Sequence, residues 1–141
     1  LCDSEIMEVI KPGQHGSTFG GNPFAATIAK KALEIIVDEN LSQNARNLGQ
    51  IFRYSISEYI KTSKIVSKIR GKGLLNAIVI NDSPDSETAW NICLRLRDNG
   101  LLAKPTHGNI IRFAPPLVIT KDQLLNCIKI IIFTLKEFEP K

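Results

Sequence analysis

The stretch RGKGLLNAIVI, residues 70–80, combines a glycine-rich start with an apolar run of strand length. The run from Leu74 to Ile80 has glycines before it and Asn81-Asp82-Ser83-Pro84 after it, a pattern that favours a β-strand. The two glycines permit a tight turn, so Arg70 and Lys72 are expected in a structural turn with solvated charges. The spacing and the Gly-Lys-Ser/Thr ending of a phosphate-binding P-loop are absent.

The residues that follow this strand predict a helix and then a hairpin. A helix is expected from Ser86 to Asn99, and Gly100 stands where a C-terminal glycine belongs. The apolar segments Leu101–Ala103 and Ile110–Phe113 are expected to pair as two strands around a turn at residues 105–109. The apolar side of the helix and the two strands would then share one core.

Capping patterns predict three further helices. The pair Asn22-Pro23 supplies an N-cap and a first helical residue for a helix that reaches about Glu39. An apolar stripe predicts a second helix over about residues 41–59. Thr120 and Gln123 form a capping box that begins the last helix.

The order of these elements predicts an α+β fold, in which a small sheet carries helices on one face. Residues 1–10 are expected to form a short strand and a turn. The best domain boundary lies near Asn40, where a long helix gives way to a more compact unit.

The composition argues against several classes of protein. The 141 residues carry a net charge of +4, but Lys and Arg are scattered, so a solvated surface is favoured over a nucleic-acid site. Cys2, Cys93 and Cys127 are widely spaced and form no CxxC pair, which indicates a reducing compartment without a disulfide framework or zinc site. No apolar run approaches membrane-spanning length, no leader is visible, and the first residues have the character of an internal segment. No metal-ligand cluster or nucleophile triad is apparent.

The segment HGSTFGGNP, residues 15–23, is a glycine-rich loop with hydroxyl groups that leads into a helix. Free N–H groups and the helix dipole attract anions to such a place, phosphate above all. Ser17 and Thr18 would add hydroxyl donors. Because Gly-Ser loops are common, a plain turn is the interpretation that the residues alone favour.

Arg112 stands inside the apolar strand Ile110–Phe113, just before Pro115-Pro116. A guanidinium buried there needs an anionic partner, and its fork geometry suits a carboxylate held by two hydrogen bonds. A structural salt bridge to an Asp or Glu elsewhere is the slightly favoured alternative. His15 and His107 are interpreted as loop and turn residues, not as catalytic bases.

Together these segments resemble the class-III aminotransferases, which depend on pyridoxal 5'-phosphate. Residues 15–23 resemble the loop-to-helix segment of this family, and residues 70–74 resemble the strand entry of its C-terminal domain. Residues 71–80 and 93–119 are similar to the ornithine-type members in particular. The resemblance covers nearly the whole chain, and the last two runs are long and specific.

The resemblance implies the C-terminal part of a fold-type I pyridoxal-phosphate transferase. Residues 1–39 would be the tail of the large cofactor-binding domain with its linking helix, and residues 40–141 the small C-terminal domain. Thr18, with Ser17 beside it, is implied to contact the cofactor phosphate of the neighbouring subunit, so a homodimer or higher homo-oligomer with shared active sites is expected. Arg112 is implied to hold the α-carboxylate of the substrate.

The activity that the resemblance implies is transfer of the δ-amino group of ornithine to 2-oxoglutarate, giving glutamate semialdehyde and glutamate. In the family, the lysine that carries the cofactor as a Schiff base and the aspartate at its pyridine nitrogen lie upstream of the matched segment. These 141 residues alone are therefore expected to be inactive. The expected location is the mitochondrial matrix, with the cytoplasm as the alternative.

Three alternatives stay open. The first is another class-III aminotransferase, of the acetylornithine or 4-aminobutyrate type, against which the ornithine-type run from Cys93 to Ile119 argues. The second is a non-catalytic remnant that folds, dimerises or binds a full-length partner. The third is a small basic module that binds nucleic acid, against which the scattered charge argues.

Overall fold

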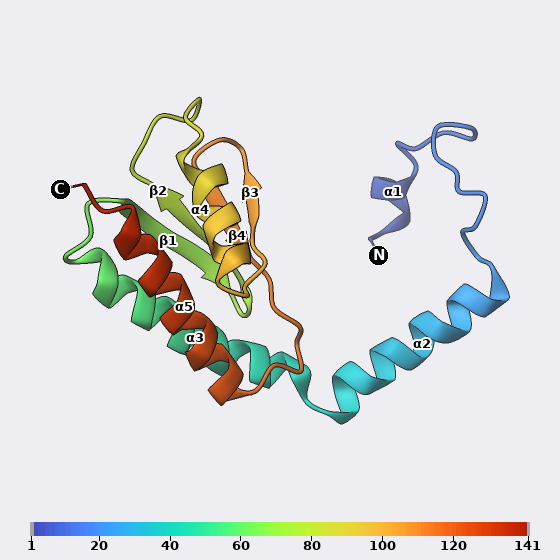
Figure 1. The fold of residues 1–141 in the computed structure, drawn as a ribbon. Coiled ribbons are helices and arrows are strands. Elements are labelled where there is room, and N and C mark those ends of the chain that lie inside the picture. Colours follow the sequence, from blue (N-terminus) through green and yellow to red (C-terminus); the bar gives the residue numbers. More distant parts are fainter. Residues whose placement is uncertain (1, 141) are drawn as a thin grey trace. The chain divides into compact units, whose positions relative to one another are not determined.

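The computed structural model describes residues 2–140, which divide into two compact units (Figure 1). The first unit ends at Glu39 and the second begins at Asn40. Asn40 has a left-handed backbone conformation, with φ of 50° and ψ of 40°, through which a right-handed helix cannot continue. The assignment of the two units to a large and a small domain of a longer enzyme stays a prediction.

The first unit contains a short helix, α1 (Ser4–Met7), and a long helix, α2 (Pro23–Asp38). The strand expected within residues 1–10 is wrong. A strand needs a neighbouring strand for its backbone hydrogen bonds, and a single helical turn satisfies them locally instead. The N–H of Glu8 donates to the carbonyl of Ser4 over 2.9 Å, which closes this turn.

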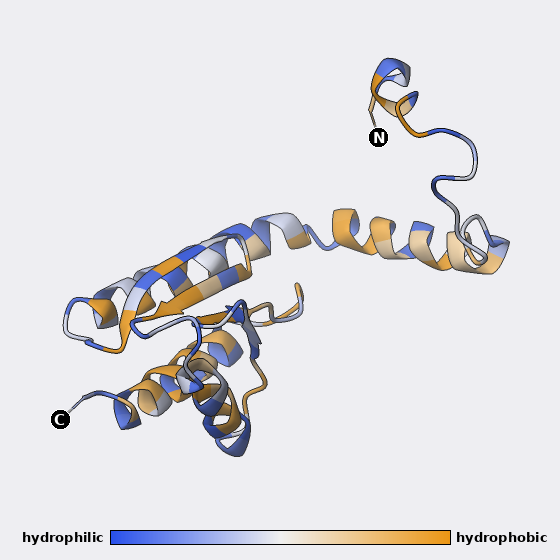
Figure 2. Ribbon diagram, turned by 90° about the horizontal axis from the view of Figure 1, so that it is seen from above, coloured by the Kyte–Doolittle hydropathy of each residue, from blue (hydrophilic) through white to orange (hydrophobic). Residues whose placement is uncertain are grey.

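The predicted start of α2 is confirmed. The Asn22 side chain accepts hydrogen bonds from the N–H groups of Phe24 (2.9 Å) and Ala25 (3.2 Å), and Pro23 takes the first helical position. No residue of α2 is buried, although Figure 2 shows much of the helix coloured as hydrophobic. The cap therefore contributes local stability, on the order of 1 kcal/mol, to a helix that buries no residue within its own unit.

The second unit is an α+β fold, as the sequence predicts. Its helices are α3 (Leu41–Ile60), α4 (Thr88–Asp98) and α5 (Lys121–Glu137). Its strands are β1 (Val66–Lys72), β2 (Leu75–Ile80), β3 (Lys104–Thr106) and β4 (Ile110–Phe113). The strands form one sheet in the order β1-β2-β4-β3, and each neighbouring pair is antiparallel. Within residues 2–140, the helices are too short or too polar to cross a membrane.

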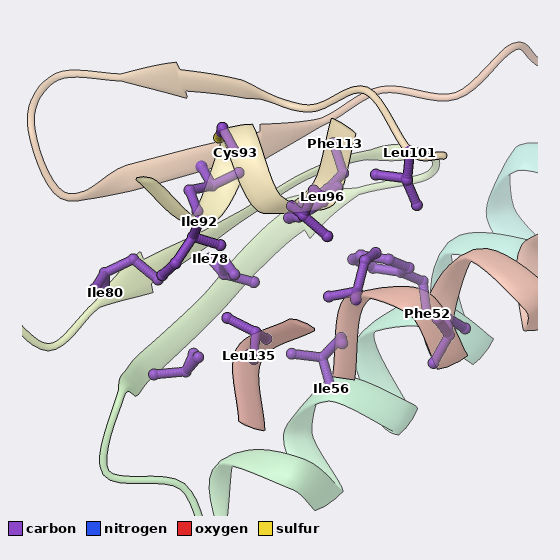
Figure 3. Packing of buried hydrophobic residues seen from close by; sticks show 14 of the residues in the cluster. Phe52, Ile56, Ile78, Ile80, Ile92, Cys93, Leu96, Leu101, Phe113 and Leu135 are labelled. Carbon is purple, nitrogen blue, oxygen red and sulfur yellow. The ribbon is translucent and has the colours of Figure 1, made fainter. Parts of the chain in front are cut away.

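The three helices of the second unit share one apolar core with one face of the sheet (Figure 3). Ile78 on β2 and Ile111 on β4 are fully buried and meet Ile56 of α3, Ile92 of α4 and Leu135 of α5 in the same cluster. Burying one such side chain stabilises the fold by about 1.5–3 kcal/mol. The opposite face of the sheet, which we call the open face, carries the alternate residues of each strand.

Two expectations about the strands are wrong. Arg70 and Lys72 lie within β1, not in a turn, and the turn begins at Gly73. The strand expected at residues 101–103 instead starts at Lys104. Leu101 belongs to the end of α4, because its N–H donates to the carbonyl of Leu96 over 2.9 Å around a left-handed Gly100.

The turn between β1 and β2 packs closely against α3. A Cβ atom added to Gly49 of α3 would lie 1.8 Å from the carbonyl oxygen of Gly73, so no other residue fits there without a shift. The Arg53 guanidinium donates 2.9 Å hydrogen bonds to that same carbonyl and to the side-chain oxygen of buried Asn76. This contact ties the start of β2 to α3 and sets the position of both strands against the helix.

The end of the chain is tied to α3 through Glu139. Its carboxylate accepts hydrogen bonds from the Tyr59 hydroxyl (2.7 Å), the Ser63 hydroxyl (2.5 Å) and the N–H of Lys64 (2.8 Å). Burial tends to raise the pKa of Glu139, but these hydrogen bonds outweigh it and hold the pKa below its ordinary value. Burial and the bond to Glu139 raise the pKa of Tyr59 to about 12.

The Tyr59 contact predicts a loss of stability at alkaline pH. Because the pKa of Tyr59 is higher in the folded chain than its ordinary value of 10.0, the folded state holds this proton more tightly, and that stabilisation is lost between pH 10 and about 12. In the complete protein, Tyr59→Phe should lower the free energy of unfolding at neutral pH by about 1 kcal/mol. The variant should also lose less of its free energy of unfolding between pH 10 and about 12 than the unmodified protein does. Urea unfolding at each pH measures this free energy. Tyr54→Phe, at an exposed position on the same helix, is the control. An equal alkaline decline in Tyr59→Phe and in the unmodified protein would contradict the assignment.

Candidate functional site

The first turn of α2 does not present the free N–H groups that a helix start offers to an anion. Pro23 has no N–H, and the N–H groups of Phe24 and Ala25 donate to the Asn22 side chain. The next N–H, that of Ala26, donates to the Asn22 carbonyl over 2.9 Å. The first turn of α2 therefore has no free backbone donor for an anion, and only the helix dipole and nearby side chains remain to attract one.

Ser17 and Thr18 both lie exposed in this loop. The Ser17 hydroxyl oxygen accepts a 2.9 Å hydrogen bond from the N–H of Gly20, which folds the loop back on itself. Its own proton stays available for donation, because this bond uses only the oxygen as acceptor. Among the described residues, the Thr18 hydroxyl has no hydrogen-bond partner. The loop thus offers two hydroxyl donors a few residues before the positive end of α2.

Arg112 lies on β4 between two buried residues, Ile111 and Phe113, but it is itself exposed. Neighbouring side chains on a strand point to opposite faces, so Arg112 projects from the open face. The expectation that its guanidinium is buried in the strand is wrong for this reason. The structural salt bridge considered as its alternative role is also not found among residues 2–140.

Strand pairing places a second arginine on the same face. Ala77 of β2 pairs with Arg70 on one side and with Arg112 on the other, and Lys104 of β3 pairs with Arg112. These four residues form a row across the open face, with the smallest side chain between the two arginines. A hollow of about 410 Å³ is lined by three residues of this row, Arg70, Ala77 and Arg112, and also by Thr106.

The sequence contains a signal for part of this row. Lys68, Arg70 and Lys72 alternate with other residues at a period of two, as the charged face of a strand does. The glycines of RGKG favour a turn more strongly, and a turn gives Arg70 no direct chemistry. Its closeness to Arg112 cannot be deduced from the sequence, because it depends on pairing between strands that are far apart along the chain.

Other groups that could carry chemistry are less favourable. Burial raises the pKa of the Cys93 thiol to about 11 and also raises that of Cys127, so neither is a thiolate at neutral pH. His107 is exposed at the tip of the β3–β4 hairpin, in a left-handed conformation with φ of 49°. Among residues 2–140, no three His, Cys, Asp or Glu side chains are grouped as metal ligands.

Each candidate site lies within its own unit. Ser17 and Thr18 belong to the first unit, and Arg112 belongs to the second. The loop offers hydroxyl donors to an anion such as phosphate. The open face offers guanidinium groups, whose fork geometry suits carboxylates. Both are sites for anions, and neither contains a nucleophile paired with a base.

A family model described as Aminotransferase class-III matches residues 1–135. Ornithine aminotransferase, mitochondrial, from Rattus norvegicus is 54% identical over 138 residues, which are 98% of this chain and 31% of the relative. An ornithine aminotransferase from Schizosaccharomyces pombe is 50% identical over 138 residues, which are 97% of this chain and 31% of the relative. The chain thus spans about a third of the length of these relatives.

Solved structures similar to this chain are also aminotransferases. One of them is named for acetylornithine instead of ornithine. The acetylornithine aminotransferase from Elizabethkingia anophelis has a TM-score of 0.86 and 63% identity, over 98% of this chain and 34% of that one. The ornithine δ-aminotransferase from Plasmodium falciparum has a TM-score of 0.85 and 45% identity, over 99% of this chain and 36% of that one.

Proposed function

This chain belongs to the class-III aminotransferases, and on that premise we propose that it is the C-terminal part of an ornithine aminotransferase. The complete enzyme transfers the δ-amino group of ornithine to 2-oxoglutarate and forms glutamate semialdehyde and glutamate. The observation that carries this proposal is the 54% and 50% identity to relatives named ornithine aminotransferase, each over nearly the whole chain. The resemblance of residues 71–80 and 93–119 to ornithine-type members supports it further.

The donors of the α2 loop fit the phosphate of pyridoxal 5'-phosphate. Phosphate oxygens accept hydrogen bonds, and the hydroxyl protons of Ser17 and Thr18 are free to donate them. The positive end of the α2 dipole adds a favourable field. When bound, the cofactor supplies an electron sink for the reacting carbon, and the protein supplies its orientation and electrostatic environment. These hydroxyls would hold the phosphate of the partner subunit's cofactor, which makes the proposed enzyme a homodimer or higher homo-oligomer.

Arg112 is proposed to bind the α-carboxylate of the substrate. Its guanidinium is exposed on the open face and has no acidic partner among residues 2–140. A free guanidinium can hold a carboxylate by two parallel hydrogen bonds. Ile111 and Phe113, anchored in the core on either side, fix the strand from which it projects. The lysine that carries the cofactor is proposed to lie in the part of the relatives that this chain does not cover.

A second candidate function is acetylornithine aminotransferase. It is favoured by the 63% identity to the structure from Elizabethkingia anophelis, which exceeds the 54% identity to the rat relative. The two substrates share their α-carboxylate, so Ser17, Thr18 and Arg112 serve either one. For the cellular location we propose the mitochondrial matrix, because the rat and Drosophila melanogaster relatives are named mitochondrial. The cytoplasm is the alternative, since the Schizosaccharomyces pombe name carries no such word.

Substrate preference of the complete protein tests the proposed function. With 2-oxoglutarate as amino acceptor, kcat/KM for ornithine should exceed kcat/KM for N-acetylornithine by roughly tenfold or more, a difference of about 1.4 kcal/mol in transition-state free energy. The measurement is the initial rate of glutamate formation with each donor. The reverse preference would transfer the assignment to acetylornithine, and no glutamate from either donor would exclude both functions.

Removal of the Arg112 guanidinium should weaken carboxylate binding. In the complete enzyme, Arg112→Ala should raise the KM for the carboxylate substrate by roughly 100-fold, and Arg112→Lys should recover only part of this, because Lys lacks the planar fork. The absorbance of the bound cofactor should not change. Arg46→Ala removes another arginine, on α3, and is the matched control. Unchanged steady-state kinetics in Arg112→Ala would show that this residue does not bind the substrate carboxylate.

Removal of the Thr18 hydroxyl should weaken cofactor binding. Thr18→Val keeps the shape of the side chain but loses its donor, so the dissociation constant of pyridoxal phosphate should rise by roughly 10- to 100-fold. Thr18 is a cleaner choice than Ser17, whose oxygen also holds Gly20. Thr62→Val, at another exposed threonine, is the control. Equal cofactor affinity in Thr18→Val and in Thr62→Val, measured by equilibrium dialysis, would contradict this role.

A further inference from the structure

The start of β2 and the end of β4 contain a buried polar side chain, Asn76, directly beside Arg112. Asn76 pairs with Phe113, and the next pair along the same strands joins Ala77 to Arg112. Only 3% of the Asn76 surface is exposed. Because side chains alternate along a strand, Asn76 and Phe113 point into the core while Arg112 projects from the open face. The contacts that hold this core-facing pair therefore also hold the backbone that carries Arg112.

Two consecutive residues of α3 contact this pair from the core side. The ring of Phe113 packs against the ring of Phe52, with 5.7 Å between the ring centroids (Figure 3). The Nη1 atom of Arg53 donates a 2.9 Å hydrogen bond to Oδ1 of Asn76 and another 2.9 Å bond to the carbonyl of Gly73. Helix α3 thus holds the end of β4 by an apolar contact and the start of β2 by a charged donor.

The apolar contact alone leaves room for movement. A cavity of about 320 Å³ is lined by Phe52 and Phe113 together with other apolar residues, so this end of β4 is not packed on every side. The lining of a cavity loses the contacts that would otherwise hold it in place. The bonds of Arg53 are directional, and a shift of β2 would leave the buried Oδ1 atom of Asn76 without its donor, which is costly. Arg53 therefore supplies a restraint that the two rings do not.

The charge of Arg53 has no other partner within the second unit. Arg53 is half-buried, and among residues 2–140 it takes part in no ion pair. Both of its hydrogen-bond acceptors are neutral oxygens at the start of β2. A charged donor makes stronger hydrogen bonds to such oxygens than a neutral donor does. The role that these contacts give to Arg53 is to fix β2 and, through the strand register, β4.

From this arrangement we propose that Arg53 is a positioning residue for Arg112. It holds the start of β2 against α3, and the pairing of Ala77 with Arg112 passes this position on to β4. The Arg112 guanidinium then projects from a fixed point and loses less freedom when a carboxylate binds. The inference rests on the proposed function, in which Arg112 binds the α-carboxylate of the substrate. Arg53 acts through Arg112 and bonds to the core side of the sheet, away from the open face.

The experiment is a double-mutant cycle on the complete enzyme with ornithine as the substrate. Arg53→Gln should raise the KM by roughly tenfold and change kcat by less than about twofold, because the loss is one of substrate binding. In the Arg112→Gln background, Arg53→Gln should raise the KM no further, since the group that it positions is already absent. Arg53→Lys should give an intermediate KM, because one nitrogen atom makes both bonds and the lysine side chain is shorter. Arg46→Gln, at an exposed arginine of the same helix, is the matched control.

Three results would overturn the inference. The first is an equal KM in Arg53→Gln and Arg46→Gln. The second is the same rise in KM with and without Arg112, because additive effects indicate independent sites. The third is a lower melting temperature and a lower kcat at unchanged KM, which is the result of a purely structural role that reduces the amount of folded enzyme. If Arg53→Gln does not fold, Arg53→Lys takes its place in the same cycle.

A binding measurement separates this inference from the proposed function. Pentanoate, a monocarboxylate without an amino group, is titrated by calorimetry into the complete, cofactor-free protein. Arg53→Gln should weaken pentanoate binding by roughly tenfold, and only where Arg112 is present. Inactivity of the unmodified protein with ornithine contradicts the proposed function, while the pentanoate cycle still decides whether Arg53 positions Arg112. Absence of pentanoate binding to the unmodified protein would contradict carboxylate binding at Arg112 and the inference with it.

Discussion

The side-chain period of two along β2 and β4 governs the second unit. Ile78 and Ile111 point into the core, so their neighbours Ala77 and Arg112 must point to the open face. A shift of one residue in the pairing would turn Arg112 inward and expose Ile111, at a large cost in buried charge. The apolar core and the basic row are thus two results of one register. The contact of Gly73 with Gly49 and Arg53 of α3 fixes the start of β2 against the helix.

Sequence patterns correctly predict those structural elements whose stabilising hydrogen bonds lie within a few residues of each other. The Asn22 cap of α2 and the box of Thr120 and Gln123 at the start of α5 each form within a few residues, and both are confirmed. The strand expected at residues 101–103 is wrong, because an apolar run after a helix also suits a helix end. Leu101 folds back onto Leu96, and the strand begins only at Lys104. The sequence contains both possibilities, and the packing of Leu101 into the core decides between them.

In the candidate site too, some features could be predicted from local sequence, and others depend on tertiary packing. The residue type and strand of Arg112 could be predicted, but its exposure could not, since the sequence does not say which face of the sheet the helices cover. The opposite problem arises at α2. The sequence suggests free N–H groups at the start of this helix, whereas the Asn22 side chain already accepts those of Phe24 and Ala25. Arg70 pairs with Ala77 across two strands. The spacing of residues within one strand therefore does not reveal how far Arg70 lies from Arg112.

Among residues 2–140, the order β1-β2-β4-β3 leaves the outer edges of β1 and β3 without a neighbouring strand. An exposed edge can add a strand from another molecule and so begin aggregation. One edge, β3, is only three residues long and contains Pro105, which has no N–H to donate to such a strand. The other edge, β1, carries Lys68, Arg70 and Lys72, and a second copy brought alongside it would place like charges together. The cations of β1 therefore also protect the sheet from intermolecular growth, and replacing them with apolar residues would create an adhesive edge.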